Sequence, residues 1–379
     1  MVSTIHWTEG SVRRSARWHS ENGTPLPRRT VVVDDRTRAD DAYHHACAGT
    51  ALLWRGDFHN ARHLLQAMGR RIDRTPPTPG TSPAETYRLH RRDSGHRARV
   101  LGRLLVLLDD DYGLALRRAP DVRRACLEAY GPPKGPMAVS LRELLGVTGA
   151  HQWRLKGVEV PVLGARVHPH YGVFAPVRGE YVDLVAEAPL PPAVRCAPAG
   201  ATAFDLGTGT GVLAAVLARR GIGRVVATDI SPRALACAEE NVRRLALTGR
   251  VRVWGPGLFP EGRADLVVCN PPWIPARPTG PVEQGVFDPD GAMLHGFLAG
   301  LAARLRPGGE GWLVLSDLAE LLGLRTRAHL LDAVRAAHLR VVDRIDTRPR
   351  HRRSRDTTDP LHAARRAETT SLWRLTTAA

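Results

Sequence analysis

The stretch AFDLGTGTGVLAAVLARRG (203–221) decides the fold. An apolar strand pattern runs into Gly207-Thr208-Gly209-Thr210-Gly211, and an apolar helix pattern follows directly. Glycine lets the backbone turn tightly and leaves no Cβ between the backbone and a ligand. The N-terminus of the following helix presents free N–H groups and a positive potential. The stretch therefore predicts a strand, a ligand-binding turn and a helix.

The same alternation of strand and helix continues to the end of the chain. Helical patterns cover GVLAAVLARR, PRALACAEENVRRLAL, MLHGFLAGLAARL and residues 318–338. Apolar strands separated by amphipathic helices predict a mostly parallel, doubly wound sheet that is covered on both faces. The expected strands are ATAFDLGT, RVVATDIS, RVRVWG, ADLVVCNPP, GWLVLSD, RVVDRID and TSLWRLTT.

Two acids accompany the glycine-rich turn. Asp205 lies just before the turn, where it can anchor the loop or bind an amino group of a ligand. Asp229 ends the next expected strand, and a carboxylate at this place can accept hydrogen bonds from both hydroxyls of a ribose. The alternative for Asp229 is the cap of the following helix, but Ser231 can fill that role.

The fourth expected strand ends in Asn270-Pro271-Pro272-Trp273. The prolines end the strand and fix the backbone, and the ligand crevice of an open α/β sheet lies at this edge. An amide or aryl amine nitrogen is a poor nucleophile because its lone pair is delocalised, so it needs orientation and polarisation. The Asn270 side-chain oxygen and the Pro271 carbonyl can each accept one N–H, and Trp273 can stack on a planar group.

Residues 201–317, with the G-x-G-x-G turn and Asn-Pro-Pro-Trp, resemble the class I methyltransferases that depend on S-adenosylmethionine. The resemblance implies a seven-stranded sheet whose last strand is antiparallel, with the cofactor's methionine carboxylate at the helix N-terminus. It also implies that Asp205, Gly207, Thr208, Gly209, Gly211, Asp229, Ile230 and Asn270 contact the cofactor. The family often carries an acid near the end of strand three. Here Gly255-Pro256-Gly257-Leu258-Phe259 stands there, so backbone groups and the Phe259 ring are the expected adenine contacts.

Residues 153–185 and 286–317 are similar to corresponding parts of release-factor glutamine methyltransferases. That resemblance implies a translation-related protein as the acceptor, methylated on a glutamine amide. The alternative is an exocyclic amine of adenine or guanine in RNA or DNA. Small-molecule methylation and an inactive binding protein are further alternatives, and the intact motifs argue against the latter. The family's acidic-threonine run is replaced by Val177-Arg178-Gly179-Glu180-Tyr181, which leaves the acceptor open.

The pattern before the methyltransferase-like half is different. Residues 1–38 are polar and arginine-rich and are expected to form a disordered or extended basic arm. Residues 39–150 show helical periodicity and predict an all-helical domain. Because the following half contains what methyl transfer needs, this domain is expected to bind the acceptor, with a purely stabilising role as the alternative. Residues 151–190 predict a β-hairpin, formed by 157–167 and 171–177, and a connecting helix. Residues 191–379 are the expected catalytic domain.

The composition leaves the partner open. The formal net charge is +16, which favours nucleic acid, but all 54 basic residues except Lys134 and Lys156 are arginine, which is typical of codon bias. The basic run 348–360 is expected to be a solvated loop, with a phosphate contact as the alternative. Five scattered cysteines, the lack of a long apolar run and the polar N-terminus favour a cytoplasmic protein without a membrane segment. His168, His170 and the His44-His45 pair lack partners at ligand spacing, so no metal is expected.

Overall fold

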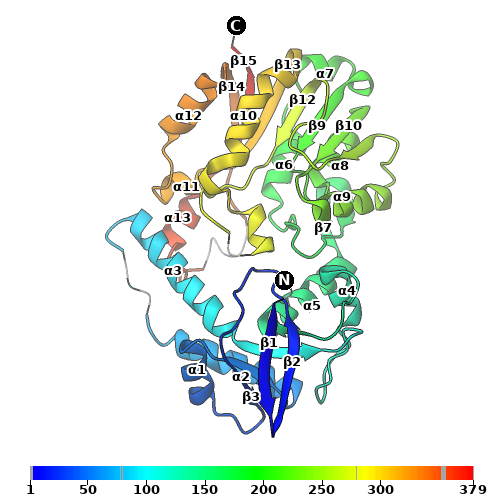
Figure 1. Ribbon diagram of the computed structural model, residues 1–379. Helices are drawn as coiled ribbons and strands as arrows, with labels where there is room; N and C mark the ends of the chain where they lie inside the picture. The colour runs from blue at the N-terminus through cyan, green and yellow to red at the C-terminus, as the bar shows by residue number, and fades with distance from the viewer. Residues whose placement is uncertain (1–2, 77, 79, 279, 351–355, 379) are drawn as a thin grey trace. The chain divides into compact units, whose positions relative to one another are not determined.

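In the computed structural model the glycine-rich stretch begins with β9 (Thr202–Leu206), an inner strand of a seven-stranded sheet (Figure 1). The model describes residues 3–76, 78, 80–278, 280–350 and 356–378. The chain divides into two units: unit 1 comprises Met1–Gly80 and Arg88–Gln152, and unit 2 comprises Thr81–Tyr87 and Trp153–Ala379. Each unit has its own sheet.

The sheet of unit 2 has the strand order β11-β10-β9-β12-β13-β15-β14. β15 is antiparallel to both of its neighbours, whereas the other pairs are parallel. All seven predicted strands are present, and the expected doubly wound, mostly parallel sheet is confirmed. Its strands are β9 (Thr202–Leu206), β10 (Arg224–Thr228), β11 (Val251–Trp254), β12 (Ala264–Cys269), β13 (Leu305–Ser316), β14 (Leu339–Thr347) and β15 (Thr370–Thr377).

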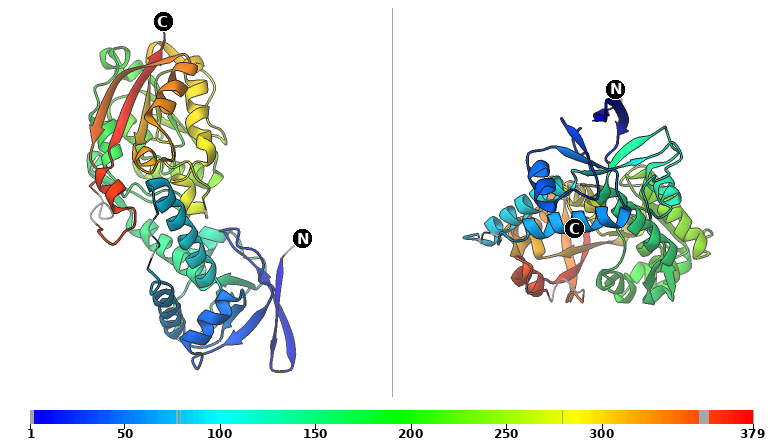
Figure 2. Two further views of the ribbon diagram at one scale, coloured as in Figure 1. Left: turned by 90° about the vertical axis from the view of Figure 1, so that its left-hand side faces the viewer. Right: turned by 90° about the horizontal axis from the view of Figure 1, so that it is seen from below.

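Helices cover both faces of this sheet, as Figures 1 and 2 show. Successive strand residues point to opposite faces, so Val225 lies in one apolar core and Val226 in the other. The first core packs under α6 (Glu180–Glu187), α7 (Pro192–Cys196), α8 (Val212–Arg219) and α9 (Pro232–Arg244). The second packs under α10 (Ala292–Arg304) and α12 (Arg327–Ala336).

The remaining elements of unit 2 are short. They are β7 (Val158–Val160), β8 (Ala165–Val167), α11 (Leu318–Leu321), α13 (His362–Ala367) and the 3-10 turns η1 (Pro161–Leu163), η2 (Pro198–Gly200), η3 (Pro281–Gly285) and η4 (Pro289–Gly291).

Unit 1 is a second α/β fold, not the all-helical domain that the sequence predicted. Its six strands have the order β1-β2-β6-β5-β4-β3. The strands are β1 (Thr4–Glu9), β2 (Val12–Trp18), β3 (Thr30–Val33), β4 (Ala51–Trp54), β5 (Leu104–Leu108) and β6 (Met137–Ser140). The helices are α1 (Ala39–Cys47), α2 (Phe58–Ile72), α4 (Arg123–Tyr130) and, extending into unit 2, α3 (Pro83–Leu101) and α5 (Leu141–Lys156).

The error in residues 39–150 has a physical cause. β4 and β5 are four and five residues long, and nearly all of their side chains are buried. A short, continuous apolar run has no period of its own, so ALLW reads as part of a neighbouring helix. Within residues 39–150 the helical prediction is correct for α1, α2, α3 and α4 and for the part of α5 that lies there.

The prediction of a disordered or extended basic arm over residues 1–38 is also wrong for the described residues 3–38, which contain β1, β2 and β3. β1 and β2 form an antiparallel hairpin in which Glu9 pairs with Val12 across a two-residue turn. Ile5 and Trp7 of β1 and Ala16 and Trp18 of β2 are buried against the sheet. Figure 2 shows this hairpin in blue, and its buried residues share an apolar cluster with Leu53 and Leu105, whose side chains point to the sheet face opposite to the one covered by α1 and α2. His6 and Thr8 are exposed on either side of the buried Trp7, and Arg17 is partly exposed between Ala16 and Trp18, so the mean composition conceals a local period-two pattern.

The connecting segment 151–190 is not separate from the catalytic unit. A hairpin is present, but its strands, β7 and β8, both lie within 157–167, and residues 171–177, predicted as the second arm, form no strand. The predicted helix is α6, and its Tyr181, Val182 and Val185 are buried in the same core as β9 and α8. The expected boundary at residues 190/191 therefore moves to 152/153.

Candidate active site

Asp205 holds the glycine-rich turn from behind. Its Oδ2 atom accepts hydrogen bonds from the Thr208 hydroxyl at 2.6 Å and from the Ala214 N–H at 2.9 Å. The carboxyl is buried, and burial raises its pKa to about 6, while the two hydrogen bonds act in the opposite direction. Of the two expected roles, the geometry favours loop anchoring.

The turn exposes its backbone to an open space. Gly207 and Gly209 both have positive φ values, 68° and 54°. A Cβ at Gly207 would collide with the Met293 side chain, whereas one at Gly209 would meet no atom within 4 Å. The space beside Gly209 is therefore available to a ligand that approaches the backbone.

Asp229 closes the side of this space. Its Oδ2 atom accepts from the Gly209 N–H at 3.0 Å, and Oδ1 accepts from the Ser231 N–H at 2.9 Å. Burial raises the pKa of the carboxyl. Ser231, not Asp229, caps α9, because its side chain accepts from the Ala234 N–H. Each carboxylate oxygen has further acceptor capacity for a ligand hydroxyl.

Asn270 follows β12 at the same edge of the sheet. The Trp273 Nε1–H donates to Asn270 Oδ1 at 2.9 Å, which occupies one of the two acceptor positions of that oxygen. The guanidinium of Arg178 lies over the Trp273 ring, 5.4 Å from the ring centroid. The tryptophan is therefore bonded on its edge and covered on one face by residues of its own chain.

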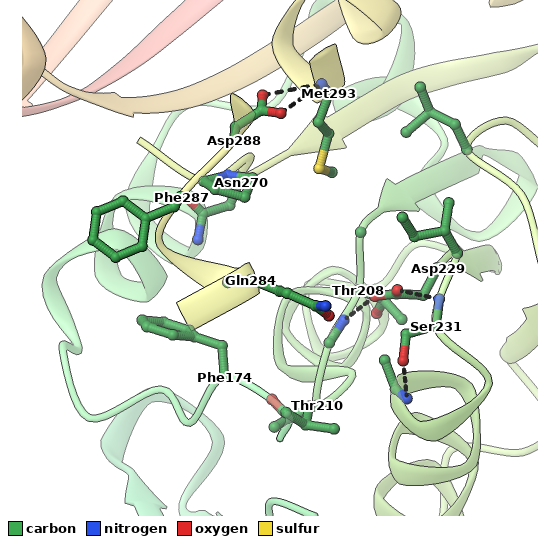
Figure 3. Close-up of a pocket in the computed structure, with 18 of the residues that line it drawn as sticks. Phe174, Thr208, Thr210, Asp229, Ser231, Asn270, Gln284, Phe287, Asp288 and Met293 are labelled. Atoms are coloured by element: carbon green, nitrogen blue, oxygen red, sulfur yellow. Dashed lines mark hydrogen bonds between the residues drawn. The ribbon is translucent and has the colours of Figure 1, made fainter. Parts of the chain in front are cut away.

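A cavity of about 630 Å³ joins these elements. Figure 3 shows Asp229 and Ser231 on one side of it and Phe174, Phe287 and Asn270 on the other. It is lined by Gly172, Val173, Phe174, Tyr181, Gly207, Thr208, Gly209, Thr210, Val212, Leu213, Asp229, Ile230, Ser231, Ala234, Gly257, Leu258, Asn270, Pro272, Pro278, Gln284, Gly285, Phe287, Asp288, Pro289, Ala292 and Met293.

The structure brings most of the predicted site residues to this cavity. Gly207, Thr208, Gly209, Asp229, Ile230, Asn270 and Pro272 line it, whereas Asp205, Gly211, Phe259, Pro271 and Trp273 do not. Gly211 caps α8 with a φ of 81°. The Phe259 ring packs against Gly300 of α10, and its neighbour Leu258 reaches the cavity in its place.

Several lining residues were not predicted. Phe174 and Tyr181 come from the segment before β9, and Phe287, Asp288 and Met293 come from the segment after β12. The buried Asp288 carboxylate accepts from the Met293 and Leu294 N–H groups at the start of α10, as Figure 3 shows for Met293. The Phe-Asp-Pro-Asp-Gly sequence before a helix was the available signal, because an acid at this place is a typical helix cap.

The weaker motifs have partners of their own. His168 Nδ1 lies 2.6 Å from the Arg154 carbonyl, and His170 Nε2 lies 2.8 Å from Glu240. In the described part of the chain no group of three or more His, Cys, Asp or Glu side chains is placed to hold a metal ion. The same residues include no helix that is long and apolar enough to cross a membrane. Residues 351–355 of the basic run 348–360 lie outside the described residues.

A glycine-rich turn after the first strand, an acid after the second and Asn-Pro-Pro-Trp after the fourth, on a sheet of this order, define a class I methyltransferase domain of the type that uses S-adenosylmethionine. Residues 166–324 match the family model of the methyltransferase small domain. Unit 2 therefore contains a methyltransferase small domain.

Curated relatives agree with this result. The release factor glutamine methyltransferase of Cereibacter sphaeroides is 36% identical over 165 residues, which are 40% of this chain and 58% of that protein. That of Moorella thermoacetica is 44% identical over 122 residues, which are 28% of this chain and 43% of that protein. The ribosomal protein L11 methyltransferase of Pelotomaculum thermopropionicum is 52% identical over 73 residues, which are 19% of this chain and 24% of that protein. The chain thus spans less than two thirds of the length of each.

Proposed function

We propose that this protein transfers a methyl group from S-adenosylmethionine to a planar nitrogen, and that its acceptor is a glutamine amide of a translation-related protein. The observation that carries the proposal is that Asn270, the glycine-rich turn and Asp229 line one cavity. The polar group expected to orient a nitrogen thus lies beside the groups expected to hold the cofactor.

The residues of the cavity fit S-adenosylmethionine. Asp229 would accept from the ribose hydroxyls, and the backbone at Gly209 and the N-terminus of α8 would hold the methionine part. Ile230, which is 75% exposed and lines the cavity, offers an apolar surface for the adenine ring. Asp288 adds a second carboxylate, which suits a ligand that carries positive charge. When bound, the cofactor supplies an electrophilic methyl group.

Asn270 would orient the acceptor nitrogen. The remaining acceptor position of Asn270 Oδ1 receives one N–H, whereas the Pro271 carbonyl, which the sequence predicted to receive the other, belongs to a buried residue that does not line the cavity. The Asn270 oxygen stabilises the positive charge that develops on nitrogen, and it does not need to remove a proton first. Because Trp273 does not line the cavity, the aromatic surface offered to the acceptor comes instead from Phe174, Tyr181 and Phe287.

Two features favour a glutamine over a nucleic-acid base. Relatives over the matched segment include methyltransferases named for release factor glutamine and for ribosomal protein L11. Among the described residues that line the cavity, none is arginine, lysine or histidine, so a phosphate would find no cation inside. The observation that favours the alternative, an exocyclic amine of an RNA or DNA base, is the net charge of +16.

Asn270→Ala tests the chemistry. We expect turnover to fall about a hundredfold or more, as for the loss of an oriented polar group, while the affinity for S-adenosylmethionine stays within about twofold. Calorimetry measures the affinity, and tritium transfer from labelled cofactor into cell extract measures turnover. A folded variant with unchanged turnover would show that Asn270 has only a structural role.

The same labelled extract identifies the acceptor class. Digestion with protease should release the label if the acceptor is a protein, and digestion with nuclease should leave it in place. The opposite result would establish the nucleic-acid alternative.

A further inference from the structure

The residues that replace the family's acidic-threonine run contact the Asn-Pro-Pro-Trp segment. Arg178, just before α6, places its guanidinium over the Trp273 ring. Trp273 in turn donates its Nε1–H to Asn270 Oδ1 at 2.9 Å. Arg178 comes from the segment where this chain departs from the family. It is linked through Trp273 to Asn270, whose amide is proposed to orient the acceptor.

Arg178 is itself fixed from a third segment. Its Nη1 and Nη2 atoms donate to the two carboxylate oxygens of Glu368 at 3.3 and 3.1 Å. Glu368, which lies between α13 and β15, has a fully buried side chain and accepts a further hydrogen bond from the Ser316 hydroxyl at 2.7 Å. A two-point contact of this kind fixes the plane of a guanidinium, which a single contact does not.

We propose that Arg178, held by Glu368, is a positioning residue that fixes the Trp273 ring and, through it, the orientation of the Asn270 amide. The expected effect of Arg178 on turnover rests on the proposed function. The expected fixing of the Trp273 ring does not depend on that function. The indole can donate to Asn270 only while the ring stays in its plane. A planar cation bound at two points holds the ring there without blocking its edge. Arg178 touches neither of the proposed reactants, so its effect is on the rate and not on cofactor affinity.

The test uses the full chain labelled with 5-fluorotryptophan. The eight tryptophans give separate fluorine resonances, and Trp273→Phe identifies that of Trp273. Arg178→Ala should shift or broaden the Trp273 resonance, lower kcat about tenfold and leave the affinity for S-adenosylmethionine within about twofold. Arg178→Lys keeps the charge but loses the planar contact, so it should restore only part of kcat.

Arg327→Ala is the matched control. Arg327 lies over Trp373, 5.2 Å from the ring centroid, and pairs with Glu320, so its removal takes away a similar stacked arginine elsewhere. It should leave the Trp273 resonance and kcat unchanged. If Arg178→Ala does not fold, Arg178→Lys and Glu368→Gln carry the same test, because both preserve the volume of a buried pair.

A double variant separates positioning from general stabilisation. If Arg178 acts through Trp273, adding Arg178→Ala to Trp273→Phe should lower kcat little further. An unmoved Trp273 resonance in a folded Arg178 variant, or effects on kcat that multiply, would overturn the inference. Wild-type protein that transfers no methyl group would refute the proposed function instead, and the fluorine resonance would still report on Arg178.

Discussion

Asp229, which is half-buried, and Asp205, which is fully buried, have different tasks. Asp229 lines the cavity and accepts two backbone N–H groups there, whereas Asp205 lies behind the turn and bonds only to its own chain. The sequence predicted that both would be near the cofactor. The sequence could not separate the roles of the two aspartates. A shift of one residue near a turn changes the side of the backbone on which a carboxylate lies, and the sequence pattern does not show this side.

Replacement of Asp229 should weaken cofactor binding. Asp229→Ala removes charge-assisted hydrogen bonds to two hydroxyls, and we expect a loss of about 1.5–3 kcal/mol in binding free energy. Asp229→Asn, which keeps one acceptor and the volume, should lose less. Calorimetry on folded variants measures both, and an unchanged affinity in Asp229→Ala would refute the ribose contact.

Asp205 should make stability depend on pH. Burial raises the pKa of its carboxyl from 3.8 to about 6 in the folded protein, so the folded state holds this proton more tightly than the unfolded chain does. The stability that the protonated carboxyl contributes is fully present below pH 4 and is lost as the pH rises through 6. Relative to wild type, Asp205→Asn should therefore gain about 2 kcal/mol in free energy of unfolding between pH 4.5 and pH 7.5.

Urea unfolding at the two pH values measures this change. Asp290→Asn, at an exposed position, is the control variant and should track the wild type. A constant difference between Asp205→Asn and wild type at both pH values would contradict the burial of an ionisable Asp205.

The elements of the two units differ in how well the sequence predicted them. In unit 2 most strands of the sheet are separated by helices, so the period changes at those boundaries, and all seven strands were found, including β11 and β12, which no helix separates. In unit 1, β4 and β5 are short and buried on both faces, and in the β1–β2 hairpin the buried Trp7 and Trp18 stand next to polar residues. The sequence did not reveal β4 and β5 because they are short, and it did not reveal the hairpin because its mean composition is polar.

The same limit applies to the site. The turn, Asp229 and Asn270 lie in recognisable motifs at strand ends, and the structure places all three at the cavity. Phe174, Tyr181 and Phe287 come from irregular segments or from the helix before β9, whose positions depend on packing. The Phe259 ring packs under α10 because Gly300 leaves room for it, and no local pattern reveals that fit.

The β1–β2 hairpin should contribute to the stability of unit 1. Trp7 is 4% exposed and packs with Ile5 and Trp18, so Trp7→Ala should cost about 3–5 kcal/mol in free energy of unfolding. Val12→Ala, in the same hairpin but with Val12 53% exposed, should cost less than about 0.5 kcal/mol. Denaturant unfolding checks both values. Equal, small effects would mean that residues 4–18 do not pack on the sheet.

The division into two units predicts which shortened chains will fold. A chain that begins at Pro191 lacks α6, whose Tyr181, Val182 and Val185 are buried in the catalytic core. It should show no cooperative unfolding transition. A chain that begins at Trp153 keeps α6 and the hairpin, and we expect its affinity for S-adenosylmethionine to stay within about fivefold of the full chain. Equal cofactor binding by both shortened chains would mean that α6 is dispensable.

The chain that begins at Trp153 also tests the purpose of unit 1. The lining of the cavity comes entirely from unit 2, so methyl transfer as proposed needs no residue of unit 1. We therefore expect unit 1 to bind the macromolecular acceptor, and the shortened chain should bind cofactor yet lose methylation of the full-length acceptor. If the acceptor is a protein, its affinity for the full chain should depend mildly on salt, with apolar contacts dominating. If it is RNA, the affinity should fall steeply, because arginines displace counterions from phosphates. Full methylation by the shortened chain would show that acceptor recognition lies in unit 2.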